Sequence, residues 1–413
     1  MIEWSEPHKM VRTAVQQFIQ AEIVPNLDAL EHGDTPPYAV LRKMLKTFGM
    51  DQMAKAQFDK MIEREKAIAA GNAPAEKSEG AASMIGKGDE LAMSMIPMIE
   101  LSKYCPGMVT AMGVSMGLGG GAIMNKGTLE QKERWGLDVI TMKKICSWAI
   151  TEPGSGSDAF GSMKSTARRT PDGGYVLNGS KTFITNGPYA DVIIFICKLD
   201  EPGVEQKDRK VLTFVLDSGM EGLVQSKPLR KMGIHSSPTG ELFLQDVKVG
   251  PDRLLGGSED KQSRSGAKET FTQERSGVCA MALGIVERCI ELSLDYAKQR
   301  VQFGRPIGEF QLIQAKIAEM EVARVNLQNL VFRFIEMAQE GKQMSLAEAS
   351  ASKLYSARTA VMVASEALQI HGGNGYMVEY RVEQLLRDAR ILQIYGGTDE
   401  IQVNAIAKDL LSR

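Results

Sequence analysis

Residues 190–199 read ADVIIFICKL, a run of β-branched and apolar residues that is typical of a buried strand. Gly, Pro, Asp and Asn separate this run from its neighbours, as expected for turns between strands. Three further runs of the same kind surround it: YVLNGSKTFIT (175–185), KVLTFVL (210–216) and GELFLQDVKV (240–249). The sequence therefore predicts a compact β domain between residues 145 and 250.

The sequence on both sides of this β stretch is helical in pattern. Apolar residues recur there at spacings of three and four, which indicates helices. The apolar stripes of the C-terminal runs suit a helix bundle. The clearest runs are HKMVRTAVQQFIQAEIV (8–24), MALGIVERCIELSLDYAKQR (281–300) and LIQAKIAEMEVARVNLQNLVFRFIEMAQEG (312–341).

These patterns divide the chain into three domains. We expect an N-terminal α-helical domain over residues 1–140, a middle β domain over 141–255 and a C-terminal helical domain over 256–413. Within the first domain, residues 58–90 are charged, rich in Ala and Gly and poor in large apolar residues. We interpret them as a solvated helix followed by a loose linker.

Composition limits the classes of function. The 413 residues are 43% hydrophobic, and 49 basic residues nearly balance 51 acidic ones, which describes an ordinary soluble globular protein. A net charge of −2 without charge blocks disfavours nucleic acid and membrane surfaces as partners. The first 20 residues lack the apolar core of a secretory signal, and no run of 18 uncharged apolar residues occurs.

The cysteines and histidines indicate neither disulfides nor a metal site. The five cysteines are widely spaced without a CxxC pair, which suits reduced thiols in the cytoplasm, most simply as small buried apolar residues. The four histidines are not at metal-ligand spacing, so we expect no metal.

Several segments together resemble the acyl-CoA dehydrogenase family, from Pro106 to the C-terminus. Two departures stand out: Gln384 replaces a residue that is usually basic, and residues 50–95 replace a short connection. The segments, in chain order, are AITEPGSGSDAFG (149–161), KTFITNG (181–187), KMGIHSSPTGELFLQDVKV (231–249), QRVQFGRPIGEFQ (299–311), QIHGGNGYMVEYRVEQLLRDARI (369–391) and IYGGTDEIQ (394–402).

The resemblance implies an α+β multidomain fold whose middle domain is β-barrel-like and whose C-terminal domain is a four-helix bundle. It also implies FAD as cofactor. Small hydroxyl residues and backbone amides can supply the donors that a flavin ring needs. By this resemblance Ser157 lies where flavin meets substrate, and the ring is lined by Trp148, Ile150, Thr151, Phe183 and Thr185. Taken alone, TEPGSGSD could also be a surface turn, but KTFITNG beside it favours the flavin site.

The remaining cofactor residues are expected near helix ends. Thr398 and Glu400 fit an N-cap and an acidic first turn, and the resemblance also places them beside the cofactor. Gly373 could simply belong to a C-terminal cap. The resemblance implies instead that a neighbouring subunit's FAD is held by Arg300, Phe303, Gln311, Gln369 and Gly373. We therefore expect a homo-oligomer, either a dimer or a tetramer.

The chemistry of a thioester requires a carboxylate base in a dry pocket and donors for the enolate oxygen. Many family members carry a Glu at the position of Gly396, so this chain is either inactive or takes its base from elsewhere. We favour Glu274, which stands where the long-chain and isovaleryl branches place their base, although it could be an ordinary first-turn residue. Phe271 and Arg275 beside it are candidate substrate contacts, and the Gly396 N–H is a candidate oxyanion donor.

The Gly-rich run MVTAMGVSMGLGGGAIM (108–124) bears on substrate size. Its alignment with relatives places this run on the acyl tunnel. Glycine in a helix costs about 1 kcal/mol relative to alanine, so one explanation of Gly113, Gly117 and Gly119 is that space is wanted there. Close helix packing is an equal alternative. A dinucleotide fingerprint is disfavoured because no strand precedes GLGGGA. A roomy tunnel would take a medium, long or bulky acyl group.

The predicted activity is FAD-dependent α,β-dehydrogenation of an acyl-CoA to the trans-2-enoyl-CoA, as in fatty acid β-oxidation. The resemblance implies an electron-transferring flavoprotein as the electron acceptor. Three alternatives stay open: a flavoprotein that acts on a non-CoA substrate, an oxidase that uses O₂, and an inactive flavin-binding relative.

Overall fold

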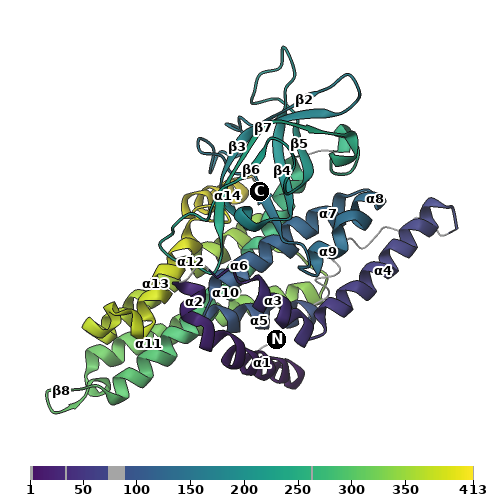
Figure 1. Cartoon of the computed structure of the whole chain (residues 1–413). Coiled ribbons are helices and arrows are strands. Elements are labelled where there is room, and N and C mark those ends of the chain that lie inside the picture. The colour runs from purple at the N-terminus through teal and green to yellow at the C-terminus, as the bar shows by residue number, and fades with distance from the viewer. Residues whose placement is uncertain (1–2, 33–34, 73–88, 262–263, 413) are drawn as a thin grey trace.

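The computed structural model describes residues 3–32, 35–72, 89–261 and 264–412, with residues 264–274 described by their backbone alone. Figure 1 shows a β domain at one end, helices from both halves of the chain beneath it, and a bundle that extends to one side. The predicted order of helices, strands and helices is confirmed.

The described residues of the N-terminal part form helices joined by turns. Helix α4 projects from the body in Figure 1, and its buried Phe58 and Ile62 pack against Met124 and Ile140. The linker predicted within residues 58–90 falls largely on 73–88, outside the described residues. The elements are α1 (Glu6–Phe18), η1 (Ile19–Ile23), η2 (Val24–Asn26), α2 (Leu27–Glu31), α3 (Tyr38–Thr47), α4 (Met50–Ala69), α5 (Asp89–Ser102), α6 (Pro106–Met112), η4 (Gly113–Gly120), α7 (Gly121–Lys126), α8 (Leu129–Gln131), η5 (Lys132–Gly136) and α9 (Leu137–Ile140).

Elements α6, η4 and α7 form one continuous helical segment, which we call the central helix (Pro106–Lys126). It is the one helix among the described residues that is long and apolar enough to cross a membrane by length and composition. Two thirds of its most apolar window (67%) is buried inside the protein, so we interpret it as a core helix.

The middle part is a seven-stranded mixed sheet in the order β1-β4-β2-β3-β7-β6, with β5 paired to β4. The described strands form an open sheet and no closed barrel, because β5 and β6 end its two sides. The four predicted strands correspond to β3, β4, β5 and β7, whereas β1, β2 and β6 were not predicted. The bounds are β1 (Cys146–Ala149), β2 (Thr166–Arg169), β3 (Tyr175–Thr185), β4 (Val192–Leu199), β5 (Val211–Asp217), β6 (Leu223–Gln225) and β7 (Thr239–Val249), with η6 (Gly187–Tyr189) after β3.

The C-terminal part is a bundle in which α10 packs against α11 and α12, and α12 against α14. A capping box formed by Ser345 and Glu348 begins α12. The elements are η7 (Pro251–Arg253), η8 (Glu259–Lys261), α10 (Arg264–Gln299), β8 (Val301–Gln302), β9 (Arg305–Pro306), η9 (Ile307–Glu309), α11 (Gln311–Gln339), α12 (Leu346–His371), η10 (Gly372–Tyr376), η11 (Val378–Tyr380), α13 (Val382–Arg390), η12 (Ile391–Gln393) and α14 (Asp399–Leu411).

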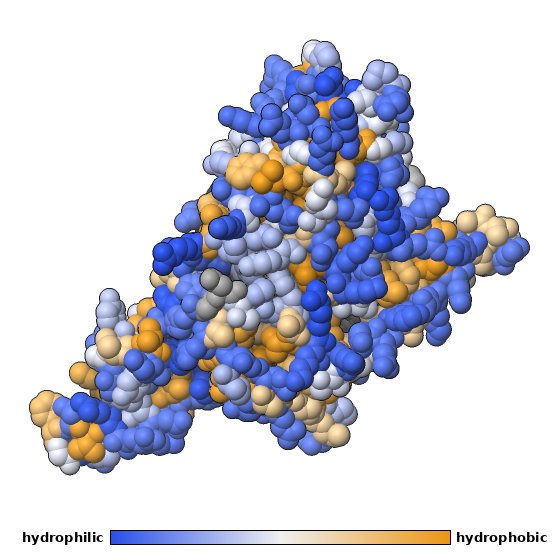
Figure 2. Space-filling view, viewed as in Figure 1, coloured by the Kyte–Doolittle hydropathy of each residue, from blue (hydrophilic) through white to orange (hydrophobic). Residues whose placement is uncertain are grey.

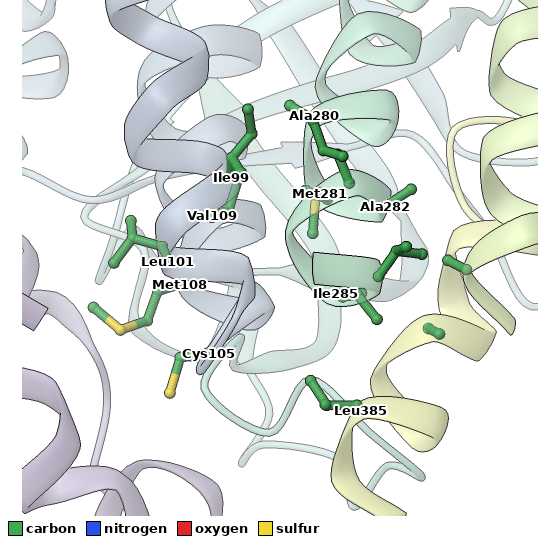
Figure 3. Close-up of a cluster of buried hydrophobic side chains, with 14 of the residues drawn as sticks. Ile99, Leu101, Cys105, Met108, Val109, Ala280, Met281, Ala282, Ile285 and Leu385 are labelled. Atoms are coloured by element: carbon green, nitrogen blue, oxygen red, sulfur yellow. The ribbon is translucent and has the colours of Figure 1, made fainter. Parts of the chain in front are cut away.

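One hydrophobic core joins the N-terminal helices to the bundle. Figure 3 shows side chains from α5 and the central helix, such as Ile99 and Val109, meeting Ala280 and Met281 of α10. Leu385 of α13 belongs to the same core. All five cysteines are buried and free, which confirms that they act as small apolar residues. This shared core fixes α10 relative to the central helix.

Candidate active site

The loop after β1 is fastened to β3 by a buried ion pair. Lys181 Nζ lies 2.9 Å from Glu152 Oε1 and donates to the Ile150 carbonyl at 3.0 Å, and Thr182 N–H donates to the Thr151 carbonyl. Glu152 also accepts from the backbone N–H groups of Lys164 and Ser165. Burial favours the neutral acid, but Lys181 and these donors prevail and lower the pKa of Glu152. The segments AITEPGSGSDAFG and KTFITNG are therefore held side by side.

The end of β3 has a strained backbone that turns an aromatic side chain outward. The register between β3 and β7 shifts between Lys181 and Ile184, and Phe183 within this irregularity has φ 57°. A positive φ is costly for a bulky residue and marks a functional constraint or a bulge. The Phe183 side chain is 69% exposed, so it presents its ring on the surface of the sheet.

Asn186, at the end of KTFITNG, joins the sheet to the N-terminal helices. It is buried, with φ 64°. Its Nδ2 donates to the carbonyls of Ala111 on the central helix and Cys146 on β1, at 2.9 and 3.0 Å. Its Oδ1 accepts from the Tyr38 hydroxyl. The sequence analysis quoted this residue within a motif and did not identify this role.

The residues predicted to line a flavin ring lie on neighbouring segments. Trp148 and Ile150 are nearly buried, Thr151 and Thr185 are half-buried, and Ser157 is exposed. The buried Trp148 Nε1 has no hydrogen-bond partner among the described residues. An orphaned indole donor, two threonines and an outward aromatic ring fit a planar heterocycle with acceptor atoms, as the flavin ring of FAD is.

The central helix has two different faces. On the packed face, a Cβ added at Gly119 would overlap the Cys146 side chain, and one at Gly120 would lie 3.1 Å from Ile140. On the open face, a Cβ at Gly113 or Gly117 would meet no atom within 4 Å. Close packing therefore explains Gly119 and Gly120, so the prediction of space at Gly119 is wrong, whereas the space predicted at Gly113 and Gly117 is present.

Two buried side chains donate hydrogen bonds to the carbonyls of the turn at Gly396 and Gly397. Gln402 Nε2 donates to both carbonyls at 2.9 and 3.0 Å, and Lys353 Nζ donates to Gly397 O at 2.7 Å. Both glycines have positive φ, 62° and 87°, which favours glycine at these positions. The sequence analysis quoted Gln402 at the end of IYGGTDEIQ without identifying this role, and it did not mention Lys353. A lysine in the Ala- and Ser-rich α12 was the available signal.

The residues after this turn begin α14. Thr398 is its N-cap and accepts from the Ile401 N–H, and Glu400 is exposed in the first turn. Asp399 is nearly buried and pairs with Arg358 at 2.9 Å. Thr398 therefore has the capping role that the sequence indicated.

Tyr395, just before the turn, connects three elements. Its hydroxyl lies 3.4 Å from Thr110 Oγ1 on the central helix and 3.3 Å from Met281 Sδ on α10. The side chains of Phe271 and Glu274 lie outside those described. Arg275 is buried. Seven residues are almost two turns of an α-helix, so positions 274 and 281 share one face of α10.

The second predicted cofactor set lies at the far end of the bundle. Figure 1 shows β8 at this tip, remote from the β domain, and Figure 2 shows hydrophobic residues there. Phe303 is 94% exposed with φ 53°, and Tyr296 stacks on His371 at 4.4 Å, which holds the end of α12 against α10. Arg300, Gln311 and Gln369 are exposed, and a Cβ at Gly373 would meet nothing within 4 Å. One chain does not bring this set together with Trp148 and Thr185.

Among the described residues, no three His, Cys, Asp or Glu side chains gather as a metal site.

Comparisons with known proteins identify the fold. Family profiles of the acyl-CoA dehydrogenase N-terminal, middle and C-terminal domains match residues 78–143, 147–247 and 265–411. The chain is 35% identical to a 3-(aryl)acrylate reductase of Clostridium sporogenes over 99% of both chains, and 32% identical to the caffeyl-CoA reductase-Etf complex subunit CarC of Acetobacterium woodii over 99% of this chain and 100% of that one. The structure of butyryl-CoA dehydrogenase from Megasphaera elsdenii is similar over 100% of both chains, with a TM-score of 0.84 and 31% identity.

Proposed function

This chain belongs to the acyl-CoA dehydrogenase family of oxidoreductases, whose cofactor is FAD, and we propose that it interconverts a bulky acyl-CoA and its trans-2-enoyl-CoA with Glu274 as the base. In the oxidative direction the Glu274 carboxylate takes the α-proton, and the β-hydrogen leaves as a hydride. FAD, when bound, supplies the hydride acceptor. The electron pair of the broken Cα–H bond becomes the new double bond, and the pair of the broken Cβ–H bond leaves with the hydride.

The observation that carries this assignment is the contact between Met281 and Tyr395. It directs one face of α10 toward the segment that contains Gly396. Position 274 lies on the same face, two turns nearer the start of the helix. Gly396 has no side chain, so the turn leaves room there for a carboxylate that comes from α10. A buried carboxylate in such a dry environment would have the raised pKa that a base for a weak carbon acid needs.

The thioester oxygen requires a preorganised donor as negative charge develops on it. We assign this role to the Gly396 N–H, since Gln402 and Lys353 hold the surrounding carbonyls and thereby fix the turn. Phe271, Arg275 and Ser157 are the proposed contacts to the rest of the substrate. Gly113 and Gly117 would line the acyl chain along the open face of the central helix.

We assign the flavin ring to the surface formed by Trp148, Ile150, Thr151, Phe183 and Thr185, with Thr398 and Glu400 near the cofactor. The set at the bundle tip, Arg300, Phe303, Gln311, Gln369 and Gly373, is exposed and remote from that surface. We therefore propose that it holds the FAD of a partner subunit in a dimer or tetramer. A tip that covers another subunit's cofactor would also bury the Phe303 ring.

The direction of the reaction and the acyl group form a second proposal. The two relatives described above carry names of reductases of aryl-substituted acrylates or acyl-CoAs, whereas the solved structure is named for butyryl-CoA. The open face at Gly113 and Gly117 favours the bulkier class. We propose an aryl or similarly bulky acyl thioester, with an electron-transferring flavoprotein as redox partner.

The test mixes the purified yellow protein anaerobically with butyryl-, octanoyl- and 3-phenylpropionyl-CoA and follows the visible absorbance of the flavin. Bleaching by 3-phenylpropionyl-CoA ahead of butyryl-CoA is expected. If all three fail to bleach a flavin that dithionite does reduce, the proposed dehydrogenation is wrong. Rapid reoxidation of the product-bound enzyme by air would favour an oxidase instead.

The base is tested with Glu274→Gln. This variant should bind FAD normally and lose the rate of flavin bleaching by about 10²–10⁴-fold, because the α-proton has no acceptor. Glu221→Gln, an exposed change on the β domain, is the control and should bleach at the native rate. Native bleaching by Glu274→Gln would refute the assignment.

Substrate size is tested with Gly117→Leu. The new side chain would enter the space on the open face, so we expect the preference for 3-phenylpropionyl-CoA over butyryl-CoA to fall at least about tenfold. The FAD content, read from the absorbance ratio, should not change. An equal loss with both substrates would mean that Gly117 does not line the acyl chain.

A further inference from the structure

All three parts of the chain meet at the loop between β6 and β7. Glu31 ends α2, Cys105 precedes the central helix and Asp388 belongs to α13, and all three are buried against this loop. A Cβ on Gly107 would lie 2.8 Å from the Ser237 nitrogen, so the central helix touches the loop backbone directly. The loop is therefore positioned by the N-terminal helices and the bundle together.

His235 sits in this loop with a carbonyl oxygen at each ring nitrogen. Its Nδ1 lies 2.6 Å from the Glu31 carbonyl, and its Nε2 lies 2.8 Å from the Lys231 carbonyl. A carbonyl only accepts hydrogen bonds, and a neutral imidazole has a single N–H. Both contacts are hydrogen bonds only when the ring carries both protons and a positive charge.

The groups around His235 can balance that charge. Asp388 Oδ1 accepts from the Ile234 N–H, and its Oδ2 accepts from Gln384 Nε2 at 3.3 Å, so it is the one of the two buried carboxyl groups that accepts hydrogen bonds from these donors. Neither oxygen of Glu31 has a hydrogen-bond partner among the described residues, although Ser236 and Cys105 lie nearby. We therefore assign the negative charge of this pair to the Asp388 carboxylate, and we assign a proton to the Glu31 carboxyl group.

Arg387 and Lys231 also act electrostatically on the two carboxyl groups, but their hydrogen bonds are directed to other residues. Arg387 makes two hydrogen bonds to Glu383, at 2.6 and 2.9 Å. Lys231 is directed to Ser237 O and Thr239 Oγ1, and burial lowers its pKa to about 8. His32 and Arg230 line, with His235, a cleft of about 340 Å³. This cleft gives protons from solvent access to the ring.

The loop continues directly into the proposed flavin surface. The Asn186 N–H donates to Pro238 O at 2.7 Å, and Thr239 is the Cα partner of Thr185 across β3 and β7. Asn186 also fixes the carbonyls of Ala111 and Cys146. A displacement at His235 would thus reach Thr185 through three residues of one loop.

We propose that His235 acts as a charged clip, a positioning residue that joins α2 to the loop and thereby sets the end of β3 against which FAD binds. The proposal rests on the proposed placement of the flavin at Thr185, which the FAD measurements below test. The charge on the ring is tested separately and needs no cofactor.

The charge is measured by NMR of the protein labelled with ¹⁵N-histidine. The chain has four histidines, so comparison with His235→Arg assigns the signal. The clip requires a proton on both ring nitrogens of His235 in the folded protein. A ring with one bare nitrogen under these conditions would overturn the clip.

The coupling is measured as FAD dissociation, followed by flavin fluorescence on dilution, from about pH 6 to about pH 9. His235→Gln loses a charged donor and should weaken FAD binding about tenfold at neutral pH. A neutral ring keeps only one of the two carbonyl contacts, so the native protein should bind FAD less tightly at the high end of this pH range. His235→Arg keeps a charge and several donors, so it should bind FAD like the native protein at the low end and keep that affinity at the high end. His32→Gln, whose ring centroid lies 6.4 Å from that of His235, is the control and should follow the native profile.

Two results would refute the coupling. One is native FAD affinity in His235→Gln across the whole pH range. The other is a high-pH loss of affinity in His235→Arg that matches the native loss. A lower melting temperature of His235→Gln with unchanged FAD affinity would show a role in stability alone and would also refute the proposal. Acyl-CoA turnover enters none of these measurements, so they stand apart from the test of Glu274.

Discussion

The protein contains two buried clusters of charge that differ in how they are balanced. At the β1 loop, Glu152 faces one lysine and two backbone donors, and the pKa of the carboxyl group is lowered despite burial. At the junction of the three parts, burial and the neighbouring Asp388 raise the pKa of Glu31 to about 8. The comparison teaches that burial alone does not decide the charge of a group: the number of donors facing it does.

The largest effect on stability is expected from removing the cation of the buried pair of Glu152 and Lys181. Lys181→Met would leave the Glu152 carboxylate buried without its cation, and we expect a loss of about 3–5 kcal/mol in the free energy of unfolding. Urea denaturation checks this. Lys207→Met, which removes an exposed lysine from an exposed pair, is the control and should change little. Equal stability of the two variants would show that the ion pair does not hold the loop.

A smaller effect on stability, which depends on pH, is expected at the buried carboxyl groups of Glu31 and Asp388. The folded pKa of Glu31 is raised from 4.5 to about 8, so the folded protein keeps a proton that the unfolded chain releases. Stability from this group is therefore complete below pH 4.5 and is lost as the pH rises to about 8. Glu31→Gln keeps a neutral side chain at every pH, so it should be more stable than the native protein by roughly 1–3 kcal/mol near pH 8, and similar to it near pH 4. Denaturation at a series of pH values checks this, and parallel curves for the two proteins would contradict it.

The smallest effect on stability is expected from placing a positive charge at position 384, beside Asp388. Gln384 lies one helical turn before Asp388, where the family usually has a basic residue. Gln384→Lys should stabilise the ionised carboxylates and flatten the pH dependence by about 1 kcal/mol at pH 8. The same change in the Glu31→Gln background should have little effect on the slope, because the titrating group is gone. An undiminished slope in Gln384→Lys would mean that position 384 does not influence the pair.

The site was only partly predictable, for reasons that particular residues show. Thr151, Phe183 and Thr185 stand in two motifs, and Trp148 directly precedes the first of them. Lys181 joins the two motifs in space, a role that the sequence analysis did not identify. Lys353 holds the turn from a position 43 residues before Gly396, outside every motif, and Gln402 ends the motif IYGGTDEIQ, which does not show which carbonyls its side chain binds. The strands β1, β2 and β6 were not predicted, since each has three or four residues and depends on its pairing partners.

The sequence by itself determined the succession of helices, strands and helices, because periodicity and turn residues act over a few neighbouring positions. It also determined the family, since long motifs in the right order are specific. Only the tertiary structure decided which glycines of the central helix face open space and which pack on Cys146. It alone brought Glu31 and Asp388, far apart in the chain, into one electrostatic cluster, because burial and charge depend on neighbours that folding supplies.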